Sequence, residues 1–387
     1  MSRAMNRLPI LAAILLMPLS ASCSSPPITA PACGTPGQWM VPAAAQAQPA
    51  EPREVLERMR GQQVVLLGER HDSAEDHRWQ LHMLAQLHAL RPRLAIGFEM
   101  FPRRVQPALD RWVAGALAEA EFLRLADWEQ VWGFDAQLYL PLFHFARMNR
   151  IPMLALNVER SLVEAVGKQG FAGVPEAQRE GVGRPAAPSP AYRKALRAVY
   201  DHHPARSRAD GDFARFVEAQ TFWDRAMAER IAAHLQQAPD ALVVGIVGAG
   251  HVRDGQGVAH QLKALGFDRT GLLLTWESAA SCAGLGQGFA DALYLIDPPQ
   301  ANPPRLGVAT EQEKDGLRVT QVTAGSIAEA AGLKSGDLIL EVAGRRADSI
   351  AVLRAAVQRQ VSGAWLPLKI RRGGEEQEIV ARFPPGS

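Results

Sequence analysis

Cysteine is scarce in this chain of 387 residues, and neither sign of charge is in excess. The three cysteines are Cys23, Cys33 and Cys282. Because Cys23 ends a signal described below and Cys33 falls in a segment expected to be flexible, we expect no disulfide framework. The 42 Lys and Arg residues stand against 40 Asp and Glu, a formal charge of +2. That balance gives no electrostatic basis for binding nucleic acid.

Several common site motifs are also missing. The chain has no Gly-x-Ser-x-Gly elbow, which argues against the usual serine hydrolase arrangement. It has no Gly-x-x-x-x-Gly-Lys phosphate loop. Gly248-Ala-Gly250 looks like the start of a dinucleotide loop, but Arg253 stands where a third glycine is needed. These absences give no indication of a nucleotide site. We also see no internal repeat, so a repeat architecture is not indicated.

The first 22 residues read as a secretory signal. Arg3 and Arg7 precede a short apolar stretch at 8–19, which is too short for a stable membrane span. Small residues then lead to Cys23, and this pattern predicts a lipoprotein with Cys23 lipidated as the mature N-terminus. Leu19 lies four residues before the cysteine rather than the usual three, so an ordinary cleaved signal is the alternative. Ser24 is compatible with sorting to the outer membrane, on the periplasmic or the surface face.

The rest of the chain is long enough for two domains. Residues 23–52 are rich in Pro, Ala, Ser and Gln and predict a flexible tether. Short apolar runs alternate with amphipathic stretches over 53–297, which predicts an α/β domain with a parallel-sheet core and flanking helices. The expected strands are 63–68, 94–99, 153–157, 242–247, 271–275 and 292–296.

Two further segments depart from this alternation. Residues 158–240 contain no convincing strand and predict a helical insertion over the edge of the sheet. A proline cluster at 297–304 ends the first domain. Short alternating strands, many glycines and one helix near 349–360 follow, so residues 303–384 predict a second, small and mostly β domain.

Acid and imidazole side chains follow the expected strands at the point where each strand ends. In an open parallel sheet these ends share one edge, where ligands bind, so we expect the side chains to converge. Two carboxylates and two imidazoles can hold a divalent metal and activate water, or act as metal-free acid and base. The plain alternative is that each caps a helix or pairs with an arginine. The candidate catalytic or metal-binding residues are Glu69, His71, Glu99 and His251, with Asn157 closing the third strand.

A second candidate site lies in the helical insertion. Tyr200, His202 and His203 end one expected helix. Tyrosinate is a hard ligand suited to ferric haem, and histidine can bond to it or take the opposite axial position. Phe213, Phe216, Phe222 and Trp223 are candidates for apolar walls, although such residues more often belong to a core. A solvated helix end, with histidines favoured by the helix dipole, is the alternative.

Residues 53–297 resemble the ChaN-like haem-binding lipoprotein family. The motifs that carry the resemblance are Gly68-Glu69-Arg70-His71, Gly97-Phe98-Glu99-Met100-Phe101-Pro102, Trp132-Gly133-Phe134-Asp135, Phe216-Val217-Glu218-Ala219-Gln220 and Gly248-Ala249-Gly250-His251. The resemblance implies a surface-anchored, haem-binding protein of iron acquisition whose subunits dimerise around stacked haems. It also implies a superfamily shared with Tiki-type metalloproteases and erythromycin esterase-like enzymes, in which the positions of Glu69, His71, Glu99 and His251 form a hydrolytic or metal centre. Tyr200 is our choice of haem ligand by neighbourhood, with Tyr192 and Tyr139 as alternatives.

Residues 303–384 resemble a bacterial PDZ domain of the kind attached to periplasmic proteases. The segments that carry the resemblance are Leu306-Gly307-Val308 and the run 326–340 with its Ala-Gly-Leu-Lys-Ser-Gly-Asp text. Such domains add an extended peptide as a strand, and backbone N–H groups near Leu306, Gly307 and Val308 would hold its carboxylate. The alternative is a PDZ fold that serves only for packing or dimer contact.

The leading hypothesis is therefore an exported, lipid-anchored, haem-binding protein with a peptide-binding module. The rival hypothesis is a metal-dependent hydrolase or peptidase to which the PDZ domain presents substrates. An interaction scaffold with neither cofactor nor turnover is the third.

Overall fold

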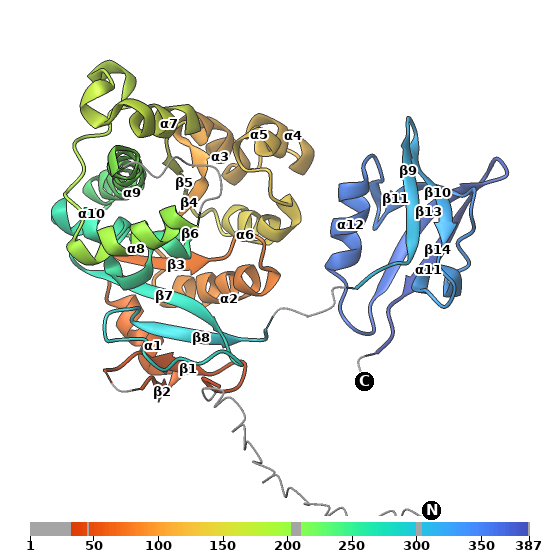
Figure 1. Ribbon diagram of the computed structural model, residues 1–387, viewed down its shortest axis with the longest axis horizontal. Helices are drawn as coiled ribbons and strands as arrows, with labels where there is room; N and C mark the ends of the chain where they lie inside the picture. The colour runs from red at the N-terminus through yellow and green to blue at the C-terminus, as the bar shows by residue number, and fades with distance from the viewer. Residues whose placement is uncertain (1–31, 45, 203–209, 299–303, 386–387) are drawn as a thin grey trace, which may run out of the picture.

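A computed structural model describes residues 32–44, 46–202, 210–298 and 304–385. The α/β part is built on an eight-stranded sheet with the order β2-β1-β8-β7-β3-β6-β4-β5 (Figure 1). Six of its strands run parallel, and they match the six expected from the sequence: β3 Val64–Glu69, β4 Leu94–Pro102, β5 Met153–Asn157, β6 Leu242–Gly248, β7 Thr270–Glu277 and β8 Ala292–Ile296.

Both faces of this sheet are covered, as the apolar runs require. Every residue of β3, β4, β5 and β6 is buried, which is usual for parallel strands with helices on both sides. Alternate side chains divide between two cores, with Val65 and Leu67 in one and Val64 and Leu66 in the other. The first core includes residues of α1 Pro52–Arg60, α2 Ala74–Leu90, α3 Gln106–Val113, α4 Glu119–Leu125, α5 Trp128–Val131 and α6 Ala136–Met148.

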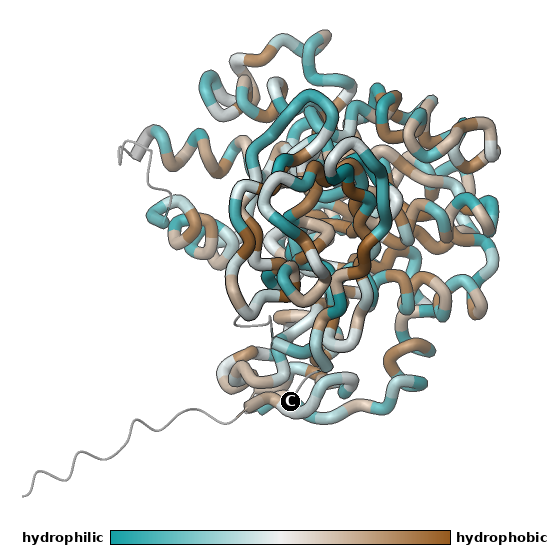
Figure 2. Tube along the Cα trace, turned by 90° about the vertical axis from the view of Figure 1, so that its right-hand side faces the viewer, coloured by the Kyte–Doolittle hydropathy of each residue, from teal (hydrophilic) through white to brown (hydrophobic). Residues whose placement is uncertain are grey.

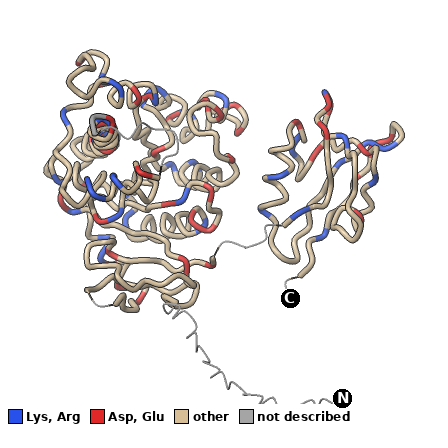
Figure 3. The backbone as a smooth tube through the Cα atoms, viewed as in Figure 1, with Lys and Arg blue, Asp and Glu red and all other residues tan. Residues whose placement is uncertain are grey.

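The opposite face packs against helices from later in the chain. Its core includes Met227 and Ile231 of α9 (Asp210–Gln237) and Val258 and Leu262 of α10 (Val258–Ala264). Figure 2 shows hydrophobic stretches toward the interior and hydrophilic stretches along outer loops. Cationic and anionic residues are interspersed along the chain rather than segregated by sign (Figure 3).

Helices occupy the segment between β5 and β6. These are α7 Arg160–Gln169, α8 Pro190–Asp201 and α9, with short 3-10 turns at Phe171–Gly173 and Glu176–Gln178, and the described residues of 158–240 form no strand. The Ser189 side chain accepts a hydrogen bond from the Tyr192 N–H, and Pro190 occupies the first turn, so both residues favour a helix start at this point.

The prediction of a flexible tether over residues 23–52 is wrong for its second half, which contains two strands. β1 Trp39–Val41 and β2 Gln48–Ala50 form a hairpin that pairs antiparallel with β8 at the edge of the sheet. Trp39 is buried, with its ring against Trp79 and Tyr294. Two buried apolar side chains, Trp39 and Met40, outweigh the polar composition around them.

The expectation of no disulfide is also wrong, because Cys33 and Cys282 are bonded to each other. Their Cα atoms lie 5.0 Å apart, within the usual range for a disulfide. The bond closes a separation of 249 residues and fastens the start of the hairpin segment to the loop between β7 and β8. Composition alone could not reveal this pairing, since it depends on the hairpin lying at the β8 edge.

Replacing both Cys33 and Cys282 by serine is expected to lower the free energy of unfolding by about 2–4 kcal/mol, since the crosslink restricts the unfolded chain. Denaturant unfolding of wild type and variant in oxidising buffer measures the difference. Adding a reductant should bring the wild type to the variant's midpoint. Equal midpoints in oxidising buffer would contradict the expectation.

The C-terminal part is an antiparallel sheet closed by helices. Its strands are β9 Val308–Glu313, β10 Gly316–Val322, β11 Leu338–Val342, β12 Arg345–Arg346, β13 Trp365–Arg372 and β14 Glu375–Arg382, in the order β14-β13-β11-β10-β9 with β12 paired to β11. α11 Ile327–Ala330 and α12 Ile350–Gln358 complete it. Its own apolar core includes Leu317, Ile339 and Leu368, so this part has the core that an independent domain needs.

The predicted carboxylate-binding turn precedes the edge strand β9. The Leu306 carbonyl accepts a hydrogen bond from the Ala328 N–H, and the Gly307 carbonyl accepts one from Thr323, both at 2.8 Å. Gly307 has a φ of +85°, and a Cβ there would lie 2.2 Å from the Ser326 Cβ. Both the backbone angle and the close approach therefore require glycine.

Gly307→Ala is expected to destabilise this turn more than Gly325→Ala. Gly325 also has a positive φ, +72°, but no atom lies within 4 Å of its added Cβ, so it is a matched control for backbone strain alone. Hydrogen exchange of the β9 amides in the full chain measures the effect. Equal exchange in the two variants would show that the close approach to Ser326 does not matter.

Among the described residues, no helix is both long enough and apolar enough to cross a bilayer. The predicted signal at 1–22 and the lipidation site Cys23 lie outside the described residues.

Candidate functional site

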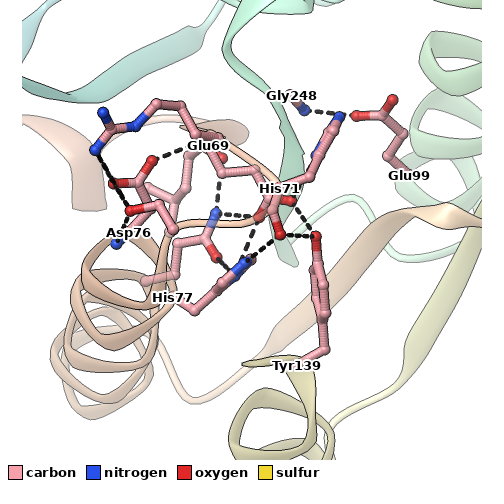
Figure 4. Close-up of polar contacts among 11 residues, drawn as sticks. Glu69, His71, Asp76, His77, Glu99, Tyr139 and Gly248 are labelled. Atoms are coloured by element: carbon pink, nitrogen blue, oxygen red, sulfur yellow. Dashed lines mark hydrogen bonds and ion pairs between the residues drawn. The ribbon is translucent and has the colours of Figure 1, made fainter. Parts of the chain in front are cut away.

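The strand order brings the predicted acid and imidazole residues together. β6 lies between β3 and β4, so the carboxyl ends that carry Glu69, Glu99 and His251 are neighbours. Figure 4 shows Glu69, His71 and Glu99 around the end of β6 at Gly248. The Gly248 N–H donates to Glu99 Oε2 at 2.5 Å. A Cβ on Gly248 would lie 2.9 Å from His71 Cε1 and 3.4 Å from Glu99 Oε2, so only glycine leaves room between them.

Glu69 is a buried carboxylate that accepts several hydrogen bonds. His71 Nδ1 lies 2.9 Å from Oε1, the Tyr139 hydroxyl donates to Oε1 at 2.7 Å, and the Gln80 amide donates to Oε2 at 2.8 Å. His77 Nδ1 lies 3.4 Å from Oε2. Burial works to raise the pKa of Glu69, but the hydrogen bonds and the nearby His77 lower it overall. Glu69 is therefore held as an anion.

His71 is the accessible member of the group, with 31% of its side chain exposed. Its ring packs edge-on against Trp132 and near Phe134, at centroid distances of 4.6 and 5.4 Å. Burial works to lower the pKa of His71, but the hydrogen bond to Glu69 and the charge of Glu99 raise it overall.

His251 lies on the other side of Glu99, with Nε2 3.5 Å from Glu99 Oε1. Its Nδ1 lies 2.6 Å from Asp224 Oδ1, and the Tyr192 hydroxyl donates to Asp224 Oδ2 at 2.7 Å. Desolvation works to lower the pKa of His251, but the charges of Glu99 and Asp224 raise it to about 9. At neutral pH His251 is thus a proton donor beside a carboxylate, a pairing that general acid catalysis uses.

Five residues of this network were not predicted as members of the sheet-edge centre: His77, Gln80, Tyr139, Tyr192 and Asp224. The sequence predicts Tyr139 and Tyr192 only as alternative haem ligands. Asp224 is fully buried on α9, among apolar neighbours such as Val217, Met227 and Ile231. A carboxylate within an apolar stripe of a helix implies a buried partner, and that pattern was the available signal.

A cavity of about 640 Å³ adjoins this centre, a size typical of small-molecule sites. Its lining includes His71, Trp132, Phe134, Asn157 and Trp223. The indole N–H of Trp223 is buried without a hydrogen-bond acceptor, and its ring lies 5.0 Å from that of His251. The cavity therefore has aromatic walls and an imidazole at its edge.

The divalent-metal alternative finds no support in this arrangement. Within the described ranges, no three His, Cys, Asp or Glu side chains are placed so that they could hold a metal ion. The candidate ligands instead contact other side chains: Glu69 bonds to His71, and His251 bonds to Asp224.

The predicted haem-ligand residues Tyr200 and His202 lie at the end of α8, and Tyr200 belongs to the same apolar cluster as Tyr192. The Tyr200 ring is buried, 5.5 Å from the rings of both Phe213 and Phe216. His202 caps the helix and is exposed, with Nδ1 2.7 Å from the Ala198 carbonyl. His203 lies outside the described residues. Phe222 belongs to a different cluster, with Phe171, so it is a core residue.

Comparison with protein families matches residues 55–262, more than half of the chain, to the family described as haem-binding uptake, Tiki superfamily, ChaN. Residues 304–381 match the PDZ domain. Comparison with curated proteins gives no match.

Two solved structures illustrate the likeness. ChaN of Campylobacter jejuni, whose structure is described as showing cofacial haem binding, has a TM-score of 0.52 and 15% identity, covering 66% of this chain and 96% of that one. A serine endoprotease from Yersinia pestis has a TM-score of 0.20 and 22% identity, covering 22% and 30%. The first shows a shared fold, and the second is too distant to carry an argument. On its family match, the chain belongs to the haem-binding ChaN family of the Tiki superfamily and carries a PDZ domain after its ChaN domain.

Proposed function

We propose that this protein is exported, lipid-anchored at Cys23 and active in the acquisition or handling of haem iron. Its family supports haem as the ligand. The signal-like first 22 residues support export, and the Cys33–Cys282 bond suits an oxidising compartment. We also propose sorting to the outer membrane, because Ser24 follows Cys23.

Tyr200 is the tyrosine that we propose as the ligand of haem iron. Tyr139 and Tyr192 donate to carboxylates, and both burial and those neighbouring charges raise their pKa, which disfavours a phenolate. Tyr294 packs against Trp39 and Trp79 at the far edge of the sheet. The end of α8 combines a phenol with the imidazole of His202, the donor chemistry that ferric haem accepts.

The surroundings of Tyr200 also fit haem. The rings of Phe213, which is buried, and Phe216, which is partly buried, pack against Tyr200. Arg197 lies 3.7 Å over the Phe213 ring, with Arg193 at 5.1 Å. Two guanidinium groups beside aromatic rings suit an apolar ligand that carries carboxylates. The Tyr200 ring is 2% exposed, so binding requires it to turn outward. The Tyr200 phenolate would hold the haem iron, which would supply a Lewis acid when bound.

The observation that carries this proposal is the pairing of the Tyr200 phenol and the His202 imidazole at the end of α8. Aromatic rings and two arginine side chains pack around Tyr200. Titration of the purified mature chain with hemin, followed in the Soret region, tests it. A shifted, saturable band at micromolar hemin is expected. A spectrum equal to that of free hemin would overturn the proposal. Labelling with a radioactive fatty acid, in wild type and Cys23→Ser, tests the anchor separately.

Pairing of subunits around stacked haems is part of the same proposal, since cofacial haem binding is described for ChaN of Campylobacter jejuni. Sedimentation with and without hemin tests it. A mass that doubles on hemin addition is expected, and an unchanged mass would contradict it.

The PDZ domain is proposed to bind the C-terminus of a peptide or protein partner. Among the strands that the structure describes, β9 pairs only with β10, which leaves an edge to which an extended peptide can add. The turn at Leu306, Gly307 and Val308 lies at the start of β9. Binding of a C-terminal peptide library to the full chain, against the same library with amidated ends, tests this use of the domain. Equal binding to both libraries would contradict a carboxylate-binding turn.

A metal-free hydrolase is the second candidate function, and the orientation of His251 favours it. Its ring is held between Asp224 and Glu99 and packs against Trp223, which lines the aromatic cavity. Hydrolysis of p-nitrophenyl acetate and of fluorogenic casein by wild type and Gly248→Ala tests it, because the added methyl group fills the space between His71 and Glu99. Gly250→Ala is the matched control, since no atom lies within 4 Å of its added Cβ. Equal rates in wild type and Gly248→Ala would exclude this candidate.

A further inference from the structure

His251 contacts Glu99 of the sheet through Nε2, but its Nδ1 contacts come from the helical insertion. Its main-chain position follows β6, but its Nδ1 contact is Asp224 of α9, and Asp224 is in turn bonded to Tyr192 of α8. Asp224 is fully buried and His251 is 6% exposed. α9 directly precedes β6 in the chain, and the fold returns its Asp224 side chain to His251 beyond the far end of that strand.

One face of α9 supplies the surroundings of the imidazole. Gln220, Trp223 and Asp224 are spaced by three and four residues and so lie on the same side of the helix. The Gln220 amide lies 3.4 Å from His251 Nδ1, and the Trp223 ring packs edge-on against the His251 ring. With Asp224 fixed at Nδ1, the opposite nitrogen is directed at Glu99.

We infer that Asp224 and Tyr192 are positioning residues that fix the ring orientation and the Nδ1–H bond of His251 in the sheet-edge centre. A carboxylate on one ring nitrogen sets which way the other nitrogen points, and this determines what the imidazole can donate to. Tyr192 satisfies the second oxygen of Asp224 and holds that carboxylate in place. The inference rests on the proposal that the sheet-edge centre is a working site.

A buried pair that serves stability alone would make the same contacts, so the test needs a signal from His251 itself. The side-chain nitrogen resonances of ¹⁵N-histidine-labelled mature chain give that signal, assigned by loss of one set in His251→Gln. In wild type we expect a strongly deshielded Nδ1 proton, as for an imidazole bonded to a carboxylate. In Asp224→Asn we expect this proton resonance to be lost.

Tyr192→Phe keeps the Asp224 carboxylate and removes its second hydrogen bond, so we expect the Nδ1 proton to be retained but shifted. This milder variant keeps the inference testable where Asp224→Asn fails to fold. Tyr294→Phe, at the far edge of the sheet, is the control and should leave the resonance unchanged. A His251 signal that is the same in wild type, Asp224→Asn and Tyr192→Phe would overturn the inference.

Ester hydrolysis measured on the same samples separates the inference from the hydrolase proposal. Lost resonance together with lost activity supports both. Lost resonance in a protein whose wild type has no activity supports the bond from Asp224 to His251 but contradicts the hydrolase, and with it the working site on which the positioning role rests. An unchanged resonance overturns the positioning role, whatever the activity.

Discussion

Tyr200→Phe is expected to remove the tyrosinate signature from the hemin spectrum and to weaken hemin binding at least tenfold. The substitution keeps the ring that packs against Phe213 and Phe216 and deletes only the oxygen proposed to bind iron. The fold should therefore persist while the iron loses its anionic ligand. Absorbance titration with hemin, for wild type and variant under the same conditions, measures both effects.

Controls exist within the same chain. Tyr294→Phe alters a tyrosine at the far edge of the sheet, beside Trp39, and should leave hemin binding unchanged. His202→Ala should change the spectrum less than Tyr200→Phe, because the imidazole is proposed as a partner of the phenolate and not as the principal ligand. A variant Tyr200→Phe with the wild-type spectrum and affinity would move the site away from α8.

Stability of the α/β domain is expected to fall by about 3 kcal/mol between pH 6.5 and pH 9.5, because of His251. The pKa of His251 is about 9 in the folded protein, raised by the charges of Glu99 and Asp224 against the effect of desolvation. Its unfolded value is about 6.5. Since the folded pKa is the higher one, the stabilisation is complete below the unfolded value and is lost as the pH rises through 9. The raised pKa of His71 acts in the same direction.

At low pH the stability of the domain is also expected to fall, because of Glu69. The pKa of this carboxyl lies below its usual value in the folded state, because hydrogen bonds and His77 outweigh desolvation. Its contribution is present above about pH 4.5 and is lost as the pH falls through the folded pKa. Denaturant unfolding as a function of pH should therefore give a maximum between about pH 5 and 6.5. Asp224→Asn should flatten the alkaline limb, and an alkaline limb equal to that of wild type would contradict the assignment.

The parallel sheet could be predicted from the sequence because its signal is local. β3 and β6 are short, continuous apolar runs, and a run of this kind bounded by polar residues has few other uses in a soluble domain. The convergence of Glu69, Glu99 and His251 followed from one rule about the carboxyl ends of parallel strands. The rule applies here because β6 lies between β3 and β4 in the sheet, so the ends of the three strands are neighbours.

The remaining features depend on contacts between distant segments. The β1–β2 hairpin is only three residues per strand, and its place is determined by Trp39 packing against Tyr294 of β8. The disulfide follows from that placement. Tyr192 and Asp224 join the site because two helices of the insertion reach β6 at one point. No local periodicity encodes such a meeting.

The central claim is that this chain binds haem iron through a phenolate at the end of α8. Resonance Raman spectroscopy of the stoichiometric ferric haem complex tests it most directly, because phenolate vibrations are enhanced only when the oxygen is bonded to iron. The account predicts iron–tyrosinate bands in wild type and their absence in Tyr200→Phe. A wild-type complex without such bands, or the same bands in Tyr200→Phe, would contradict it.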